Sequence, residues 1–407
     1  MVNFYTMEIN WEAFLEYFPR VPEDEVKKRL LAFQERLKEK DVDLALVLQN
    51  VDLFYLTGSL QRGFLLVSKE EATFYVQRDY ERAHFESPLP LKKVEGFNEL
   101  KKIPFLEKVK KVGLEFDVLP LGMFLRIKEL FKNEVEFVDI SPDILSLRSV
   151  KSPYELEQIK EAVRITSEVL SLVPEFLRPG LTEVELDARL QYEGRRLGNH
   201  GWLRMRGFNQ EMCPVAVVSG VNGGIPSYVD GPIKALGTCP AIGFGTSFKV
   251  IQKDEPIIVD YGVCINGYVS DETRSYVIGK LHPKLEKAYE VSLKVIEMME
   301  KEAKPGVSVK KLYQMALDIV KTHNLEENFM GFGENRVKFI GHGIGLEINE
   351  WPIIANREEF LQEGMTFALE PKFVFPDLGA IGVELDYVVQ KGGVSRLGSL
   401  SPRLFSL

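Results

Sequence analysis

This chain of 407 residues has few cysteines, no excess of positive charge and no long apolar run. Its three cysteines, Cys213, Cys239 and Cys264, are too few and too widely spaced for a disulfide framework or a cysteine-based zinc site. A net charge of -9 argues against nucleic acid as the main partner. No apolar run approaches the roughly 18 residues of a membrane span, and the N-terminus lacks a basic segment followed by an apolar run. We therefore expect a cytoplasmic protein without a membrane partner.

The remaining composition is that of an ordinary globular protein. Hydrophobic residues make up 45% of the chain and charged residues 27%, and no low-complexity tract indicates disorder. Because single cores stop growing near roughly 250 to 300 residues, this length favours at least two domains.

The first part of the chain alternates between helical and strand-like patterns. Apolar residues recur at helical spacing among the charges of residues 23–40, and an apolar run follows at 44–48. Further elements are expected as strands at 64–67, 72–76 and 112–115 and as a helix at 121–132. Such alternation predicts an α/β N-terminal domain, for which we take residues 1–150.

A helix start marks the second domain. Ser152 is a capping residue, Pro153 stands at the first helical position, and Glu155 follows three residues after the cap. A long amphipathic pattern follows, which is typical of a helix packed on a core. We take residues 151–407 as this second domain.

An internal repeat runs through the second domain at a constant offset of 126 residues. Residues 162–186 match residues 288–312, because each segment passes from a helix through a Pro-Gly turn to a Thr or Ser that caps a second helix. The repeat predicts a pseudo-duplicated α+β domain. Its two halves would place their strands face to face, so that side chains from both halves could converge on one site.

Two aspartates occupy a predicted hairpin in the first half. Asp260 ends the β-branched run 257–260, and Asp271 follows eleven residues later, across a turn marked by Asn266 and Gly267. A strand, a turn and a second strand can bring the two carboxylates close together. Taken alone, such a pair is more often a feature of a turn or a cap.

Three further candidates lie in the second half. His342 has a glycine on each side, which lets the backbone approach whatever the imidazole contacts. Glu370 and Glu384 each end an apolar run, where an ionised carboxylate is costly unless it is paired or bound to metal. Two Asp, one His and two Glu in this order can hold two divalent cations around a shared water. The chain is therefore interpreted as a two-metal hydrolase.

This constellation resembles that of the pita-bread metallopeptidase family, which includes aminopeptidase P, prolidase and methionine aminopeptidase. The likeness is greatest to the branch that cleaves Xaa-Pro bonds and carries a creatinase-like N-terminal domain. Residues 44–58, which include the segment 54–58, resemble the beginning of that N-terminal domain, and residues 151–156 resemble the beginning of the catalytic domain. The resemblance implies an α/β N-terminal domain, a pita-bread catalytic domain and a homodimer.

The same resemblance assigns roles to the five candidates. Asp260 would chelate one metal ion, and His342 with Glu370 would hold the other. Asp271 and Glu384 would bridge the two ions. A water between the ions would lose its proton near neutral pH and become the nucleophile. Four carboxylates and one imidazole form a hard, oxygen-rich set, which favours manganese, with iron, cobalt or zinc as alternatives.

Three positions depart from the pattern of family peptidases that cleave before proline. Ser227 and Asn349 stand where such peptidases carry histidines, and Gly382 stands where they carry an arginine. In the family these groups hold the scissile carbonyl and shuttle protons, and a donor to an oxyanion contributes roughly 3 kcal/mol. Asn349 can still donate a hydrogen bond, but it cannot carry a proton at neutral pH.

Other groups must then supply proton transfer and substrate binding. Proton transfer would fall to Glu370 or to a group that the sequence does not place. His200 is a candidate substitute imidazole, with a role in a loop or the core as the alternative interpretation. Arg204 and Arg206 are candidates for binding a substrate carboxylate, with a solvated strand edge as the alternative interpretation.

The leading hypothesis is a dinuclear metallohydrolase that acts on small Xaa-Pro peptides as an aminopeptidase P or a prolidase. The alternative, motivated by Ser227, Asn349 and Gly382, is the same metal core acting on a small zwitterion by C–N hydrolysis or β-elimination. A binding protein of this fold is a third hypothesis, against which the retention of all five ligand positions counts.

Overall fold

An alternation of helices and strands builds the first of two structural units, which divide between Leu147 and Arg148. The structure, a computed structural model, describes residues 9–131 and 134–407. Residues 1–8, on which the predicted lack of a leader segment depends, lie outside the described residues. Lys132, the predicted end of a helix, lies outside them as well.

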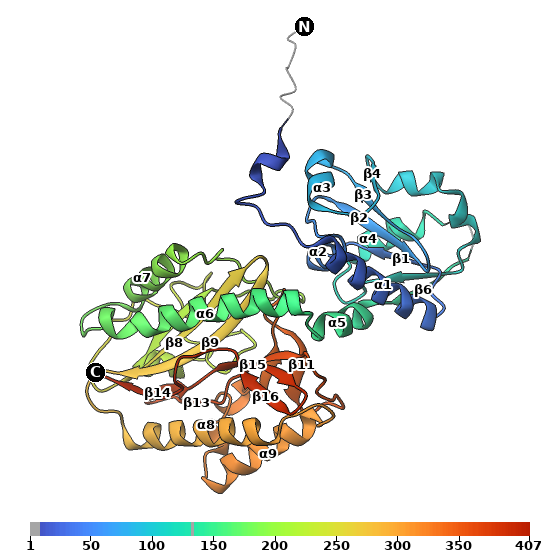
Figure 1. Cartoon of the computed structure of the whole chain (residues 1–407). Helices are drawn as coiled ribbons and strands as arrows, with labels where there is room; N and C mark the ends of the chain where they lie inside the picture. The colour runs from blue at the N-terminus through green and yellow to red at the C-terminus, as the bar shows by residue number, and fades with distance from the viewer. Residues whose placement is uncertain (1–8, 132–133) are drawn as a thin grey trace. The chain divides into compact units, whose positions relative to one another are not determined.

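The N-terminal unit contains a six-stranded mixed sheet with the order β4-β3-β2-β1-β5-β6 (Figure 1). Its strands are β1 (Leu44–Val47), β2 (Gly63–Ser68), β3 (Ala72–Val76), β4 (Leu91–Lys93), β5 (Lys111–Leu114) and β6 (Glu136–Asp139). Its helices are α1 (Glu23–Glu39), α2 (Asn50–Thr57), α3 (Tyr80–Glu86), α4 (Leu121–Lys128) and α5 (Ser141–Ser149). The α/β prediction for this part of the chain is confirmed.

The helix predicted at 121–132 is shorter in the structure, since α4 ends at Lys128. The N–H groups of Leu130 and Phe131 donate to Ile127 O and Lys128 O, three residues back instead of four. Such bonds tighten the last turn and end the regular helix.

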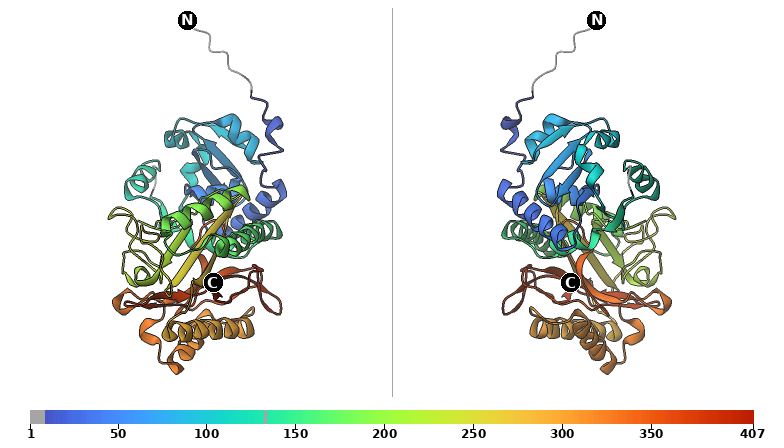
Figure 2. Two further views of the ribbon diagram at one scale, coloured as in Figure 1. Left: turned by 90° about the vertical axis from the view of Figure 1, so that its left-hand side faces the viewer. Right: turned by 90° about the vertical axis from the view of Figure 1, so that its right-hand side faces the viewer.

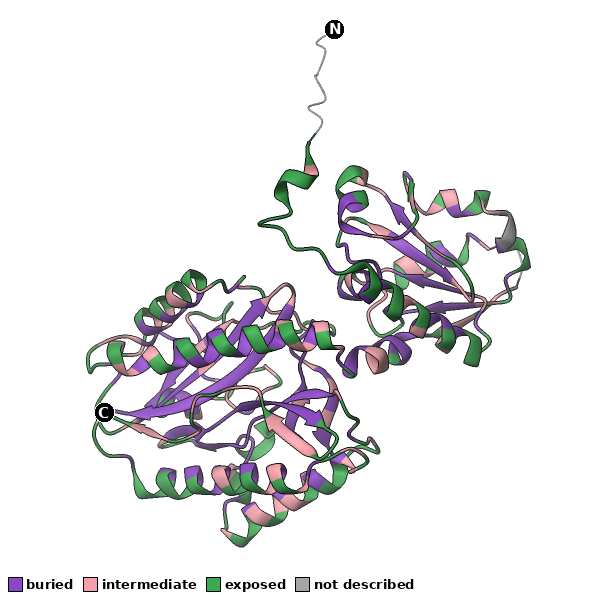
Figure 3. Cartoon of the chain, in the orientation of Figure 1, coloured by how far each residue is buried: buried purple, intermediate pink, exposed green. Residues whose placement is uncertain are grey.

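Burial explains why the central strand of this sheet is an apolar run. All four residues of β1 are buried, so both of its faces are covered. Leu44 and Leu46 share one hydrophobic cluster with Phe64 of β2 and Val112 of β5. Figure 3 shows the same distribution along the chain, with buried residues concentrated in strands and exposed residues on helix surfaces.

Two pairs of helices repeat through the second unit. They are α6 (Pro153–Phe176) with α7 (Glu183–Arg196), and α8 (Pro283–Glu302) with α9 (Val309–Thr322). The bounds of α7 and α9 differ by the predicted 126 residues, and the pseudo-duplicated α+β architecture is confirmed. The predicted capping box of Ser152 and Glu155 is present, with both of its hydrogen bonds. Within the described ranges, no helix has the length and apolar character needed to cross a membrane.

The strands of the second unit lie between these helix pairs (Figures 1 and 2). Helix α6 packs on β8 and β9, and α8 packs on β14 and β16. The strand orders are β17-β9-β8-β7, β11-β10-β12-β15-β16 and the hairpin β13-β14. The strands are β7 (Val215–Ser219), β8 (Pro256–Ile265), β9 (Tyr268–Val277), β10 (Phe339–Gly343), β11 (Glu350–Ala355), β12 (Thr366–Leu369), β13 (Lys372–Phe375), β14 (Gly379–Gly382), β15 (Leu385–Gln390), β16 (Gly393–Arg396) and β17 (Phe405–Ser406).

Hydrogen bonds join the two halves of this unit beside the long hairpin of β8 and β9. Asn266 and Gly267 form the hairpin turn with φ values of 50° and 91°, the positive values of a type I′ turn. Further along β9, the backbones of Thr273 and Glu384 exchange hydrogen bonds of 3.3 and 3.1 Å. The middle of β9 is therefore fixed against the second half.

A buried cluster of charges holds the loop that follows β10. Arg148 Nη2 lies 2.7 Å from Glu347 Oε2 and 2.6 Å from Glu350 Oε1. Lys151 Nζ lies 2.9 Å from Glu350 Oε2. Burial alone would raise the pKa of Glu350, but its cationic partners lower that pKa to about 2. The loop is thus held by buried ion pairs as well as by packing.

Replacing Glu350 by Gln should destabilise the second unit by about 3 kcal/mol at pH 7, because Arg148 and Lys151 would lose a shared buried carboxylate. The folded pKa of about 2 lies below the ordinary value of 4.5. The contribution of Glu350 is therefore complete above about pH 4.5 and is lost as the pH falls toward about 2. Denaturant unfolding at pH 7 and pH 3 measures the difference between the variant and the parent.

The matched control is Glu161→Gln, which removes an exposed ion pair with Arg164. It should change the free energy of unfolding by less than about 1 kcal/mol. A Glu350→Gln effect that matches this control, or that grows toward pH 3, would contradict the prediction.

Candidate metal centre

Asp260 and Asp271 lie on neighbouring strands with their side chains on one face. The register of β8 and β9 pairs Asp260 with Thr273, and it pairs Gly262 with Asp271. The two aspartates are therefore diagonal neighbours across the hairpin, close enough to act on one site. Both line the same cavity.

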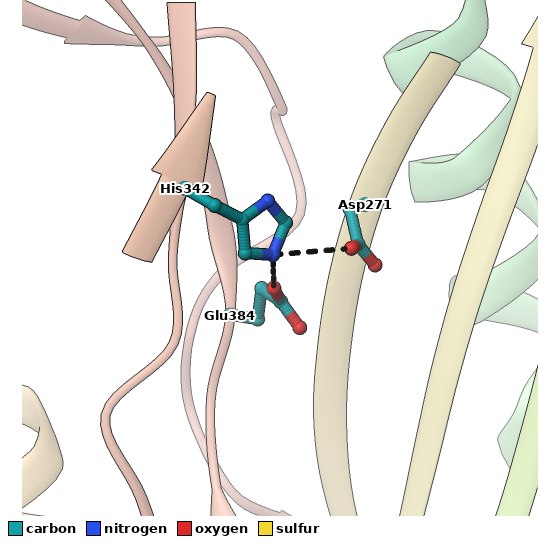
Figure 4. A group of neighbouring side chains, drawn as sticks. All are labelled: Asp271, His342 and Glu384. Carbon is teal, nitrogen blue, oxygen red and sulfur yellow. Dashed lines mark ion pairs between the residues drawn. The ribbon is translucent and has the colours of Figure 1, made fainter. Parts of the chain in front are cut away.

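His342, on β10, presents one ring nitrogen to three carboxylates. Its Nδ1 faces Gly343 O at 3.4 Å. Its Nε2 lies 3.7 Å from Asp271 Oδ2, 3.7 Å from Glu370 Oε1 and 3.8 Å from Glu384 Oε1. Figure 4 shows the imidazole directed at Asp271 and Glu384. These distances are too long for hydrogen bonds, and they suit ligand atoms that each lie about 2.1 Å from a shared divalent ion.

The two glutamates stand where strands of the second half end. Glu370 directly follows β12, and Glu384 lies between β14 and β15. The Glu384 backbone is held by its bridge to Thr273 and by Arg274, whose Nη1 donates to Glu384 O at 2.9 Å. Glu370 and Glu384 are 3% and 1% exposed. Their carboxylates therefore depend on neighbouring groups or a bound cation, and not on water, for stabilisation.

Two carboxylate oxygens of this centre are buried without a hydrogen-bond partner among the described residues. They are Asp271 Oδ1 and Glu384 Oε1. An unsatisfied buried polar group costs about 1 to 3 kcal/mol, and a charged one costs more. A divalent ion would satisfy these oxygens, since Asp271, His342 and Glu384 each offer a ligand atom within 4.8 Å of the others. The residues on this side of the centre fit a metal ion.

The carboxylates of the centre also repel one another. Burial, and then the charge of Glu384, raises the pKa of Asp271 well above its usual range. Burial raises the pKa of Glu384 in the same direction. Such a cluster requires positive charge to remain ionised.

The centre also contains a lysine that was not among the residues predicted from the sequence. Lys372 Nζ lies 3.0 Å from Asp260 Oδ2, 3.0 Å from Glu370 Oε2 and 2.6 Å from Glu384 Oε2. Burial alone would lower the pKa of this ammonium, but the carboxylates raise it well above its usual range. The sequence did contain an indication, because Lys372 interrupts an apolar run and lies two residues after Glu370, on the same side of an extended chain.

Gly382 leaves room for the lysine stem. It is the residue of β14 that pairs with Lys372 of β13. A Cβ at Gly382 would lie 2.7 Å from Lys372 Cα and 2.8 Å from Lys372 Cγ, closer than real Cβ atoms approach. The position where the resemblance predicts an arginine thus accommodates a lysine on the partner strand.

Ser227 and Asn349, the two positions where the resemblance predicts histidines, bond to backbone groups. Ser227 Oγ donates to Gly243 O. Asn349 lines the cavity, but its amide oxygen accepts from Arg206 N and its amide nitrogen donates to Arg206 O, both at 2.9 Å. Asn349 therefore holds the backbone at Arg206 in place.

His200 is not brought to the centre. Its side chain is exposed, and its Nδ1 accepts from Asn266 N at the tip of the β8–β9 hairpin. Its backbone N–H donates to Cys264 O. These bonds keep His200 beyond the cavity lining, which corrects its prediction as a substitute imidazole.

A cavity of about 660 Å³ opens onto the centre. All five predicted ligands and Lys372 line it. Arg204 and Arg206 do not, and Arg206 Nη1 instead lies 3.9 Å from the buried Glu347. Besides Lys372, the lysines and arginines that line the cavity are Arg336, Lys338 and Arg357.

Sequence comparisons match both units to known families. A sequence model of metallopeptidase family M24 matches residues 157–391, and one of the Creatinase/Prolidase N-terminal domain matches residues 29–150. The chain is 30% identical over 376 residues to an Xaa-Pro dipeptidase of Pyrococcus furiosus, covering 91% of this chain and 98% of that protein.

Solved structures show the same likeness. The prolidase from Pyrococcus horikoshii OT3 matches with a TM-score of 0.78 and 27% identity, over 92% of this chain and 99% of that one. An X-Pro aminopeptidase from Thermotoga maritima matches with a TM-score of 0.75 and 26% identity, over 91% of this chain and 100% of that one.

Replacing His342 by Ala should weaken binding of a divalent ion by more than about 100-fold, since loss of a group that only orients a ligand already costs 10- to 100-fold. The matched control His200→Ala removes an imidazole outside the cavity and should leave the affinity unchanged. Calorimetric titration of each metal-free protein with Mn²⁺ measures both effects. If His342→Ala and the parent bind Mn²⁺ with equal affinity, the ion does not bind at His342 and the prediction is wrong.

Proposed function

The chain belongs to metallopeptidase family M24, with a creatinase-like N-terminal domain and a pita-bread catalytic domain, and on this premise we propose that it hydrolyses small Xaa-Pro peptides. We propose that the two domains span residues 1–150 and 151–407. Dipeptides are the substrates we favour, because the similar protein of Pyrococcus furiosus, matched over nearly its whole length, is named an Xaa-Pro dipeptidase.

The convergence of Asp271, His342 and Glu384 on one cavity carries this proposal. These residues come from both halves of the catalytic domain, and their ligand atoms lie within 4.8 Å of one another. The cavity volume of about 660 Å³ is within the usual range for sites of small ligands. Such a cavity suits a short peptide better than a folded protein substrate.

We propose manganese as the metal, with iron, cobalt and zinc as alternatives, because the ligand set is rich in carboxylate oxygen. When bound, a divalent ion acts as a Lewis acid toward a carbonyl oxygen and makes a water molecule a stronger nucleophile. The sequence predicts two such ions. Lys372, however, lies beside Asp260, the ligand predicted for one of them.

Glu370 is the residue we propose for proton transfer. One of its oxygens faces His342 and the other faces Lys372, so both are held in defined positions at the cavity wall. From there Glu370 would accept a proton from the attacking water and deliver it to the leaving nitrogen. Asn349 is assigned a positioning role, because its amide holds the Arg206 backbone next to Met205 of the cavity lining.

Three basic residues of the cavity lining are proposed to attract the substrate carboxylate. They are Arg336, Lys338 and Arg357. A charge-assisted hydrogen bond to a free carboxylate directly after proline would favour a dipeptide over a longer peptide. This role replaces the one predicted for Arg204 and Arg206.

The second candidate function is hydrolysis or elimination on a small zwitterion that is not a peptide. It is favoured by the missing carbonyl-binding groups, since Ser227 and Asn349 are bonded to backbone groups and Gly382 has no side chain. The same cavity and the same basic lining would suit a small zwitterion.

Assembly as a homodimer and a cytoplasmic location are further proposals. The homodimer rests on the family resemblance, and the location rests on the composition of the chain.

Manganese-supplemented protein should cleave Ala-Pro and Leu-Pro faster than Ala-Pro-Ala, with free proline as the product, because the basic lining binds a carboxylate directly after proline. Mass spectrometry of the products measures this. Asp271→Asn, which removes one ligand, should lower the rate by at least about 100-fold. Preferred cleavage of the tripeptide would indicate an aminopeptidase. If the metal-loaded protein leaves all proline peptides intact, the non-peptide candidate function is favoured instead.

A further inference from the structure

The two glutamates divide the metal centre into two sides. Glu370 and Glu384 place their Oε1 atoms 3.7 and 3.8 Å from His342 Nε2. They place their Oε2 atoms 3.0 and 2.6 Å from Lys372 Nζ. Each carboxylate therefore spans the centre, with one oxygen on the histidine side and one on the lysine side.

The lysine side already contains a cation in contact with three carboxylates. Besides the two glutamates, Lys372 Nζ contacts Asp260 Oδ2 at 3.0 Å. A lysine ammonium has three N–H donors and no acceptor, so three oxygens at these distances use its full capacity. A divalent ion bound by the same oxygens would lie about 2.0 to 2.2 Å from them, in the volume that Nζ fills. The two cations exclude each other.

We propose that the ammonium of Lys372 takes the place of one of the two metal ions predicted from the sequence, so that the centre binds a single divalent ion on the histidine side. Asp271 and His342, with Oε1 of Glu370 and Glu384, are the ligands of that ion. The inference rests on the proposed metal-dependent function and revises its predicted dinuclear form.

The net charge of the carboxylate cluster also favours a single divalent ion. Asp260, Asp271, Glu370 and Glu384 carry four negative charges when ionised, of which Lys372 offsets one and a divalent ion offsets two. A second divalent ion would reverse the sign of the cluster and would lie against both cations already present. Repulsion between cations at a few ångströms is strong in a buried site.

The backbone and the side-chain stem of the lysine are held by the fold. Its carbonyl accepts from Met330 N at 2.9 Å, and its backbone pairs with Gly382 across the β13–β14 hairpin. Its side chain is 2% exposed, and the stem occupies the space that a Cβ at Gly382 would need. Movement of the ammonium toward solvent would also leave three buried carboxylates without a partner, which is costly.

Lys372 is therefore a positioning residue. Its N–H groups are directed at Asp260, Glu370 and Glu384, and none remains for a substrate. Unlike a bound ion, an ammonium on the chain is not removed by a chelator. Activity should consequently follow a simple saturation curve with Mn²⁺, with half-saturation at the affinity of one site.

The test is the number of Mn²⁺ ions bound by the metal-free full chain, measured by calorimetric titration and by elemental analysis after gel filtration. His342→Ala supplies the background of surface binding. The parent should bind one ion above this background and give the electron paramagnetic resonance spectrum of isolated Mn²⁺. Lys372→Ala should bind two ions and give the spectrum of a coupled pair. The matched control Lys338→Ala, which removes another lysine of the same cavity lining, should bind one ion.

Two coupled ions in the parent would overturn the inference and leave the proposed metal-dependent function intact. A folded parent that binds no ion would overturn that proposed function, and the inference with it. A folded Lys372→Ala that still binds one ion would overturn the role of the lysine. If Lys372→Ala does not fold, the ion number and the resonance spectrum of the parent decide between one ion and two.

Discussion

Buried carboxylates that face one another must be offset by positive charge, and the catalytic unit is organised around this requirement. Asp271 and Glu384 are nearly inaccessible to water, and each keeps a carboxylate oxygen without a hydrogen-bond donor among the described residues. Lys372 offsets part of the charge from within the chain. The remaining charge calls for a divalent ion beside His342. The residues of the proposed metal centre are therefore also buried charges that must be balanced for the unit to be stable.

The proposed metal centre lies where the two halves of the duplicated domain meet. Thr273 and Glu384 connect the halves by backbone hydrogen bonds, and Thr273 Oγ1 also donates to Glu384 Oε2 at 2.8 Å. Arg274 adds a hydrogen bond to Glu384 O. Because these contacts fix the distance between β9 and the second half, they also fix the distance between the ligands that each half supplies.

Local patterns made most of the fold and the five ligand candidates predictable. Asn266 and Gly267 favour a tight hairpin turn. The register of this local hairpin brings Asp260 and Asp271 together. The repeat at an offset of 126 residues is likewise local, because the caps and apolar faces of its helices are encoded within each segment. Glu384 is predicted in the same way, because it ends an apolar run, and the resemblance then assigns its role as a ligand.

Residues whose role depends on contacts across the fold were not predictable in the same way. The role of Lys372 in the centre depends on Gly382, which lies opposite it in the β13–β14 register. No local sequence pattern specifies this pairing. His200 is an imidazole near the correct hairpin, but at its exposed tip. Asn349 is at the cavity, yet its amide is occupied by the Arg206 backbone.

The most direct measurement is a crystal structure of the manganese-loaded protein with anomalous diffraction data collected at the manganese edge. One anomalous peak among Asp271, His342 and Glu384, with Lys372 Nζ still against Asp260, is the expected result. A second peak beside Asp260, with the lysine displaced, would show that the carboxylates are offset by two ions and would contradict the central role of Lys372.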